Sequence, residues 1–118
     1  TMKFPKHEYV RSNELLRNAR QIACQHCGAD DGTIVGAHSN SHKFGKGMGR
    51  KSDDNMIAAL CYSCHFNCDQ GSYMNQEEKE QFWHEAHLRT VFKLLQLELW
   101  PDNVPLPQSY LDFRNRLN

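Results

Sequence analysis

Two C-x-x-C pairs are the residues whose types and spacing most clearly predict chemistry. The pairs are Cys24-Gln25-His26-Cys27 and Cys61-Tyr62-Ser63-Cys64, and 33 residues separate them. A C-x-x-C turn holds two thiolates on one side of a tight knuckle, and two such knuckles supply the four sulfur ligands of a closed tetrahedral zinc site. We therefore predict a structural Zn²⁺ ion held by Cys24, Cys27, Cys61 and Cys64.

The remaining cysteine and the surrounding pattern argue against disulfide or redox chemistry. The chain has five cysteines and no signal-peptide pattern, and paired C-x-x-C spacing in such a chain favours zinc over disulfides. A thioredoxin-like redox pair is disfavoured because no βαβ pattern surrounds either motif. Cys68, the fifth cysteine, is expected to be a buried or half-buried thiol and not a ligand.

His65 and Asp69 have the spacing of a second, catalytic metal site. They are four residues apart in a segment expected to be helical, so both lie on one helical face and can chelate one cation. A nitrogen and an oxygen ligand with open positions suit Mg²⁺ or Mn²⁺. The alternative is that both are ordinary polar residues of a solvated helix.

His38 is the candidate general base. It ends a predicted strand, where a neutral imidazole can accept a proton from water. Attack of that water on a phosphodiester requires a metal ion to stabilise the charge on the phosphate and on the leaving oxygen. His42 lies four residues further on; it completes the metal shell, contacts a phosphate or has no chemical role.

A glycine-rich basic loop follows His38. Its glycines let the backbone approach a ligand closely, and its amides and cations suit phosphate groups, although the spacing is not that of a P-loop. The alternative is a plain flexible loop. The candidate DNA-binding residues are Lys43, Lys46, Arg50 and Lys51.

Local patterns predict the elements that position these residues. Ser12 is a predicted N-cap for a helix over 12–21, and β-branched or apolar runs predict strands at 33–38 and 56–60. A helix is expected from the second knuckle to about Gln70, with Gly71 ending it. Asn75 and Glu78 form a predicted capping box for a long helix over 75–100 that Pro101 stops.

Composition sets weaker bounds. The net charge is zero, but residues 1–60 carry nine Lys/Arg against six Asp/Glu, whereas residues 61–118 carry five against eight. The basic half contains the loop and the candidate base, which hints at a phosphate-facing surface. No apolar run is long enough to span a membrane. We expect a cytoplasmic protein.

These motifs together resemble the HNH nucleases, which have a ββα-metal fold. The resemblance covers residues 22–70: a C-x-x-C pair, a strand ending in a histidine, a loop, Asp54-Asn55, and an apolar run into Leu60-Cys61-x-x-Cys64-His65 with Asp69 after it. The stretch Gly47-Met48-Gly49-x-Lys51-x-x-Asp54 and the seven-residue step from Asp54 to Cys61 are similar to small phage and prophage nucleases of the recombination type, among them RecA-dependent phage nucleases.

The resemblance implies cleavage of DNA with a divalent metal. It implies His38 as general base, His65 and Asp69 at the metal positions, and the four cysteines on zinc. It also implies DNA as the partner, a recombinase as a further candidate partner and a bacterial host cell as the location. The oligomeric state is left open.

The sequence departs from the family pattern at two positions. Ala37 stands where many members have a metal-binding Asp or His. His42, Asp53 or Asp54 then fills that role, or water completes the shell, or His38 is itself a ligand. Asn55 also lies six residues before Cys61, where the family asparagine usually lies five before, so Asp54 or Asn55 holds the loop.

The sequence therefore predicts one small α+β domain over 1–118. Its zinc-fastened ββα-metal core at 22–70 is flanked by an N-terminal helix, a long helix at 75–100 and a C-terminal arm at 101–118. The predicted function is a metal-dependent endonuclease acting on DNA. The alternative is a non-catalytic zinc-binding module that interacts with DNA or protein.

Overall fold

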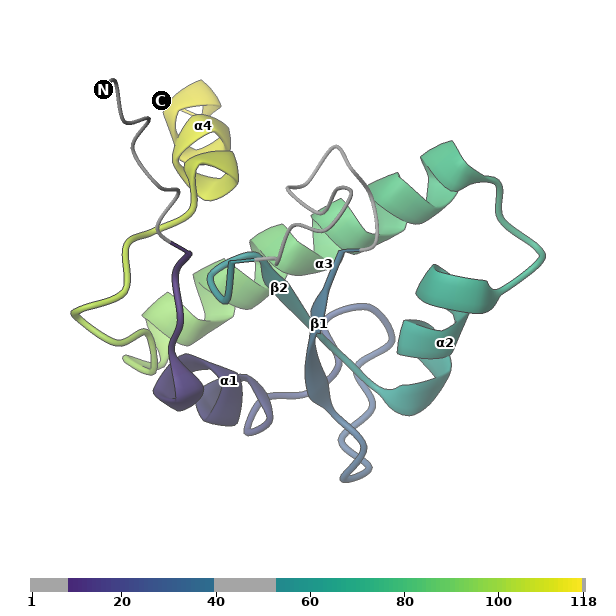
Figure 1. Ribbon diagram of the computed structural model, residues 1–118, viewed down its shortest axis with the longest axis horizontal. Helices are drawn as coiled ribbons and strands as arrows, with labels where there is room; N and C mark the ends of the chain where they lie inside the picture. The colour runs from purple at the N-terminus through teal and green to yellow at the C-terminus, as the bar shows by residue number, and fades with distance from the viewer. Residues whose placement is uncertain (1–8, 40–52, 118) are drawn as a thin grey trace, which may run out of the picture.

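Two short antiparallel strands lie at the centre of the structure, and helices surround them (Figure 1). The computed structural model describes residues 9–39 and 53–117. Within these residues the fold is α+β, and its elements in chain order are α1 (Asn13–Ala19), β1 (Val35–His38), β2 (Ile57–Leu60), α2 (Tyr62–Gln70), α3 (Gln76–Gln96) and α4 (Gln108–Arg116).

The β1–β2 pair is short, and β2 consists of apolar residues only. Val35 pairs with Leu60 and His38 pairs with Ile57 at the opposite end. Every residue of β2 is fully buried, whereas β1 is only partly buried. A two-stranded sheet of this size is marginal in water by itself, so its stability must come from the helices packed on it.

Helix α3 covers the sheet and satisfies its unpaired backbone groups. Thr90 Oγ1 accepts a hydrogen bond from the Ala59 amide at 2.9 Å, and His87 Nδ1 lies 2.8 Å from the Ile57 carbonyl oxygen. The Trp83 indole donates to the Ala37 carbonyl at 2.9 Å. Buried backbone groups without partners are costly, so these polar side chains stabilise the sheet edge.

Helix α1 packs closely on β1. Its predicted N-cap is confirmed, since Ser12 Oγ accepts from the Leu15 amide at 3.1 Å. The helix is shorter than predicted and ends at Ala19. A Cβ at Gly36 would lie 3.1 Å from Ile57 Cδ1 and 3.4 Å from a Leu16 methyl group, so glycine permits this close approach.

The long helix begins as predicted and ends earlier. Asn75 and Glu78 form the capping box, with both reciprocal hydrogen bonds present. The helix stops at Gln96 rather than at Trp100. Glu98 adopts a left-handed φ of 59°, and the Leu99 amide turns back to the Leu94 carbonyl. The turn delivers the Leu99 carbonyl to Asn18 of α1 at 2.7 Å, a tertiary contact invisible in the local pattern.

The face that α3 buries also differs in part from the apolar face that the spacing of its phenylalanine and leucine residues predicts. Leucine and phenylalanine spacing predicts burial of Phe92, which is 57% exposed. His87 is fully buried, and its ring stacks on that of Trp83 with the ring centroids 4.7 Å apart. Burial of His87 and Thr90 follows from their hydrogen bonds to β2, which remove the usual penalty for burying polar groups.

The C-terminal arm closes over the end of the sheet. The Trp100 indole donates to the Val104 carbonyl at 2.9 Å, and Asn55 Nδ2 donates to the Pro105 carbonyl at 3.0 Å. Ser109 of α4 lies 2.7 Å from His87 Nε2. In the part of the chain that the structure describes, no helix is both long and apolar enough to cross a membrane.

The buried His87 predicts a specific acid sensitivity. Burial lowers the pKa of His87 from its ordinary 6.5 to about 4. The unfolded chain therefore takes up a proton between pH 6.5 and 4 that the folded chain refuses. The free energy of unfolding should fall by up to about 3 kcal/mol across this window because of His87 alone.

Urea unfolding of wild type and of His87→Gln at pH 7, 5.5 and 4 measures this contribution. The stability gap between them should shrink as the pH falls, and effects common to both proteins cancel. Thr90→Val is the matched control, since it lies on the same buried face without titrating and its gap should stay constant. A His87→Gln gap that is equal at pH 7 and pH 4 contradicts the prediction.

Candidate functional site

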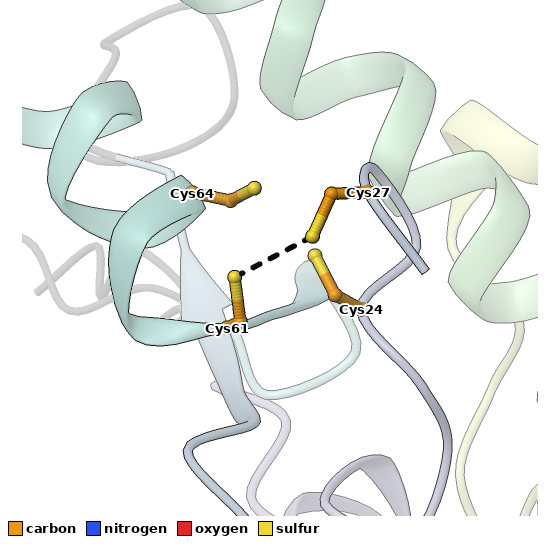
Figure 2. Close-up of side chains that lie close together, drawn as sticks. All are labelled: Cys24, Cys27, Cys61 and Cys64. Atoms are coloured by element: carbon orange, nitrogen blue, oxygen red, sulfur yellow. Dashed lines mark hydrogen bonds between the residues drawn. The ribbon is translucent and has the colours of Figure 1, made fainter. Parts of the chain in front are cut away.

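Four cysteine side chains converge on one point (Figure 2). Cys24 and Cys27 come from a turn before β1, and Cys61 and Cys64 come from the start of α2. Their sulfur atoms all lie within 4.8 Å of one another, and Cys27 Sγ and Cys61 Sγ are 3.7 Å apart. All four are free thiols.

The sulfur spacing fits a tetrahedral metal. Zinc–thiolate bonds of about 2.3 Å place the ligand sulfurs of a tetrahedron roughly 3.8 Å apart, whereas a disulfide bond is about 2.05 Å long. The cluster can therefore hold a metal ion such as zinc. Among residues 9–39 and 53–117 it is the one group of three or more His, Cys, Asp or Glu side chains arranged in this way.

Local backbone geometry presents the sulfurs. Gly28 has a φ of 81°, which glycine adopts without strain, and its amide donates to the Cys24 carbonyl at 2.9 Å. The first knuckle closes on this bond. Cys61 is the extended N-cap of α2, so Cys64 follows one helical turn later on the same side.

The electrostatics of the cluster favour a bound cation. Burial raises the pKa of Cys64, and the thiols of the other three cysteines raise it further. Burial also raises the pKa of Cys24, but the backbone amides of Cys27, Cys61 and His26 outweigh this and lower it to about 7. The Cys24 thiol therefore ionises readily, whereas the raised pKa values of Cys61 and Cys64 oppose their ionisation. A divalent cation removes that conflict by balancing several thiolates at once.

The predicted catalytic pair on α2 is in contact. His65 Nε2 lies 3.0 Å from Asp69 Oδ2, and both side chains are partly exposed. Two adjacent ligand atoms of an octahedral ion with bonds of about 2.1 Å lie roughly 3.0 Å apart, so the spacing fits shared chelation. Within the described residues, no third metal-ligating side chain joins this pair to form a group.

His38 is paired with Asp54, a residue sixteen positions away. His38 Nε2 lies 3.1 Å from Asp54 Oδ1, and the side chain of Asp54 is only 10% exposed. The carboxylate accepts the proton on Nε2, which leaves Nδ1 as the basic nitrogen. No short-range sequence pattern predicts this pair, because the two residues are sixteen positions apart.

Asp54 also connects His38, the candidate base, to the start of α1. Its Oδ2 accepts from the Ser12 amide at 2.9 Å, and its own amide donates to the Val10 carbonyl at 2.9 Å. Asp53 Oδ1 accepts from the Val10 amide at 2.8 Å. Both aspartates thus engage the segment before α1, while Asn55 binds the C-terminal arm. Between the two residues proposed to hold the loop, Asp54 is the one that contacts His38.

A small cavity lies between the end of β1 and the end of α2. Ser39, which follows the candidate base, and Asp69 of the candidate metal pair line the same space of about 60 Å³, together with Lys79 and Trp83 of α3. Cys68 lines it as well and is buried, as predicted. Burial raises the pKa of the Cys68 thiol to about 11, so it stays protonated and unreactive. The cavity thus brings the residue next to His38 and one member of the candidate metal pair to the same space.

The structure leaves some of the predicted site residues undescribed and gives no ligand at Ala37. Ala37 is buried in β1, and its carbonyl binds Trp83, so the structure offers no ligand at this position. Five candidates for the chemistry or for phosphate binding lie outside the described residues: His42, Lys43, Lys46, Arg50 and Lys51.

Comparison of the chain with protein-family models, curated proteins and solved structures finds no match.

The cysteine cluster predicts about one tightly bound zinc ion per chain. Cys24→Ser and Cys61→Ser should each lose the metal and much of the folded structure, because metal binding contributes directly to folding. Elemental analysis and thermal unfolding measure both effects. Cys68→Ser is the matched control, since Cys68 is buried but lies outside the cluster. Zinc-free wild type, or equal zinc loss in Cys68→Ser, contradicts the prediction.

Proposed function

We propose that this protein is a metal-dependent endonuclease that hydrolyses phosphodiester bonds in DNA. The observation that carries the proposal is the presence of two close residue pairs near a shared cavity. His38 is held by Asp54, His65 meets Asp69, and Ser39 and Asp69 line a common cavity. A base and a chelating pair are the minimum that such hydrolysis requires.

His38 acts as the general base through Nδ1. The Asp54 carboxylate accepts the proton on Nε2, so Nδ1 carries the lone pair that takes a proton from water. The resulting hydroxide attacks phosphorus, the bond to the 3′ oxygen breaks, and the departing oxygen is protonated by solvent. As His38 becomes positively charged, the buried carboxylate of Asp54 stabilises it.

His65 and Asp69 would hold the divalent ion, Mg²⁺ or Mn²⁺, and water, substrate oxygens or His42 would supply its remaining ligands. The bound ion supplies positive charge against the phosphate and the leaving oxygen. In the folded protein His65 Nε2 faces Asp69 Oδ2, and His65 must present this nitrogen unprotonated to serve as a ligand.

Zinc at the four cysteines fixes the frame on which this chemistry depends. Cys64 precedes His65 directly, so a metal that anchors the first turn of α2 also orients the histidine. The arrangement of strand pair, cysteine cluster and helix is consistent with a ββα-metal core of the HNH type. A phage or prophage origin, with a role in recombination or DNA processing, extends the same proposal.

Phosphate contacts in this proposal come from Lys43, Lys46, Arg50 and Lys51. These cations suit the DNA backbone more than base edges, so they would hold the substrate with little reading of sequence.

The proposal predicts that zinc-loaded protein cuts DNA only with added Mg²⁺ or Mn²⁺. His65→Ala and Asp69→Ala should weaken binding of this ion, so higher Mn²⁺ should partly restore cleavage. His38→Ala should lower turnover by about 10²-fold or more at saturating metal, as for loss of a general base. Gel assays over a metal titration, with calorimetry for metal affinity, separate the two classes.

Asp112→Asn is the control for these variants, because this carboxylate is exposed on α4. It should leave cleavage unchanged. No cutting with either ion would favour the non-catalytic zinc module. If His38→Ala loses metal and is rescued like the other two, His38 fills the ligand position vacant at Ala37, and His42 becomes the candidate base.

Asp54→Asn tests the proposed orientation of the base. The amide oxygen can still accept from the Ser12 backbone amide, so the start of α1 keeps its contact. An amide nitrogen facing His38 would donate to Nε2 and move the ring proton to Nδ1, the wrong tautomer. Turnover should fall by about 10²-fold or more with metal affinity unchanged.

Thermal unfolding of Asp54→Asn verifies that the fold survives. NMR of the histidine ring nitrogens reports the tautomer directly and does not depend on activity. A wild-type ring with the proton on Nδ1, or an Asp54→Asn variant with full turnover, would overturn the assignment of Nδ1 as the base.

A further inference from the structure

Helix α2 has two chemically distinct faces. A helix turns by about 100° per residue, so Cys64 and Cys68 lie on one side, and both are buried. Tyr62, Phe66 and Asp69 lie on the other side, with His65 beside them. The outward face thus presents two aromatic rings, and the partly exposed candidate ligands of the catalytic ion lie at its edge.

The two aromatic rings are exposed and border a hollow. Tyr62 is 71% exposed and Phe66 is 48% exposed. Together with Ser63 and Asn67 they line a shallow pocket of about 250 Å³. Both rings therefore offer open faces, and a hydroxyl and an amide lie beside them as hydrogen-bonding groups.

This lining matches a nucleobase better than an apolar protein side chain. A base offers a flat π surface for stacking and a polar edge for hydrogen bonds, and stacking on aromatic side chains tolerates any base. The groove lined by Leu88, Phe92 and Phe113 between α3 and α4 is more apolar in character, and nothing in the structure shows what covers it.

We propose that Tyr62 and Phe66 form a stacking platform for unpaired bases, which makes single-stranded or locally unpaired DNA the preferred substrate. This inference rests on the proposed nuclease function. In a duplex both faces of every base are already stacked, so only an unpaired base can lie on the rings. Both rings lie on the helix that bears His65 and Asp69, although neither of these candidate ligands lines the hollow.

Binding to fluorescent oligonucleotides tests the platform without relying on cleavage. The zinc-loaded full chain with His38→Ala is titrated with a short oligodeoxythymidylate and with a duplex of equal length. The single strand should bind more tightly. Tyr62→Leu and Phe66→Leu should each weaken its binding by about ten-fold, as expected for one lost stacking contact, and should leave duplex binding unchanged.

Tyr73→Leu is the matched control, because Tyr73 is 65% exposed but does not line the hollow. Its binding should equal that of the parent protein. Equal losses in all three variants, equal losses on both DNA forms, or no loss at all would overturn the platform. A dimer that dissociates on Tyr62→Leu, without binding of either DNA, would assign the face to a second copy of the chain.

Cleavage assays then separate this inference from the function on which it rests. Single-strand binding that depends on Tyr62, with no cleavage under any metal, keeps the platform and rejects the nuclease. Metal-dependent cutting that is unaffected by Tyr62→Leu and Phe66→Leu, on single strands and duplexes alike, keeps the nuclease and rejects the platform.

Discussion

The convergence of four cysteine sulfurs within 4.8 Å is the constraint on which the rest of the structure depends. Four thiolates cannot share such a space without a cation, because each opposes ionisation of the others. A metal that satisfies them ties the turn before β1 to the first turn of α2. Those two turns flank the strands and the candidate base, so a metal bound there would join elements that are too small to form a core of their own.

Polar side chains of α3 provide a second set of contacts that hold the sheet. The sheet has only two strands, and its backbone edge would be unsatisfied if α3 were purely apolar. Thr90, His87 and Trp83 bind backbone groups of β2 and β1 from the buried face of α3. Helix packing and edge satisfaction are therefore achieved by the same residues, which explains why a histidine and a threonine occupy the core.

Asp54 has the corresponding role at the candidate site. Its buried carboxylate joins His38, the Ser12 amide and, at 3.8 Å, the Arg11 guanidinium. The orientation of His38, the candidate base, is thereby linked to the start of α1. That helix is separate from the one that bears His65 and Asp69. Helix α2 contributes to both sites, because it carries Cys64 of the cysteine cluster and the candidate metal ligands His65 and Asp69.

The sequence by itself determined the features whose causes are local. Short-range spacing predicts the cysteine pairs and the four-residue step from His65 to Asp69. It also predicts the ends of helices: the Ser12 cap, the Asn75–Glu78 capping box and the end of α2 at Gly71. The tertiary structure decided the rest. Burial of His87, the end of α3 at Gln96 and the pairing of His38 with Asp54 depend on partners distant along the chain. Periodicity reports which residues share a helix face, but hydrogen bonds across the fold determine which polar groups that face can bury.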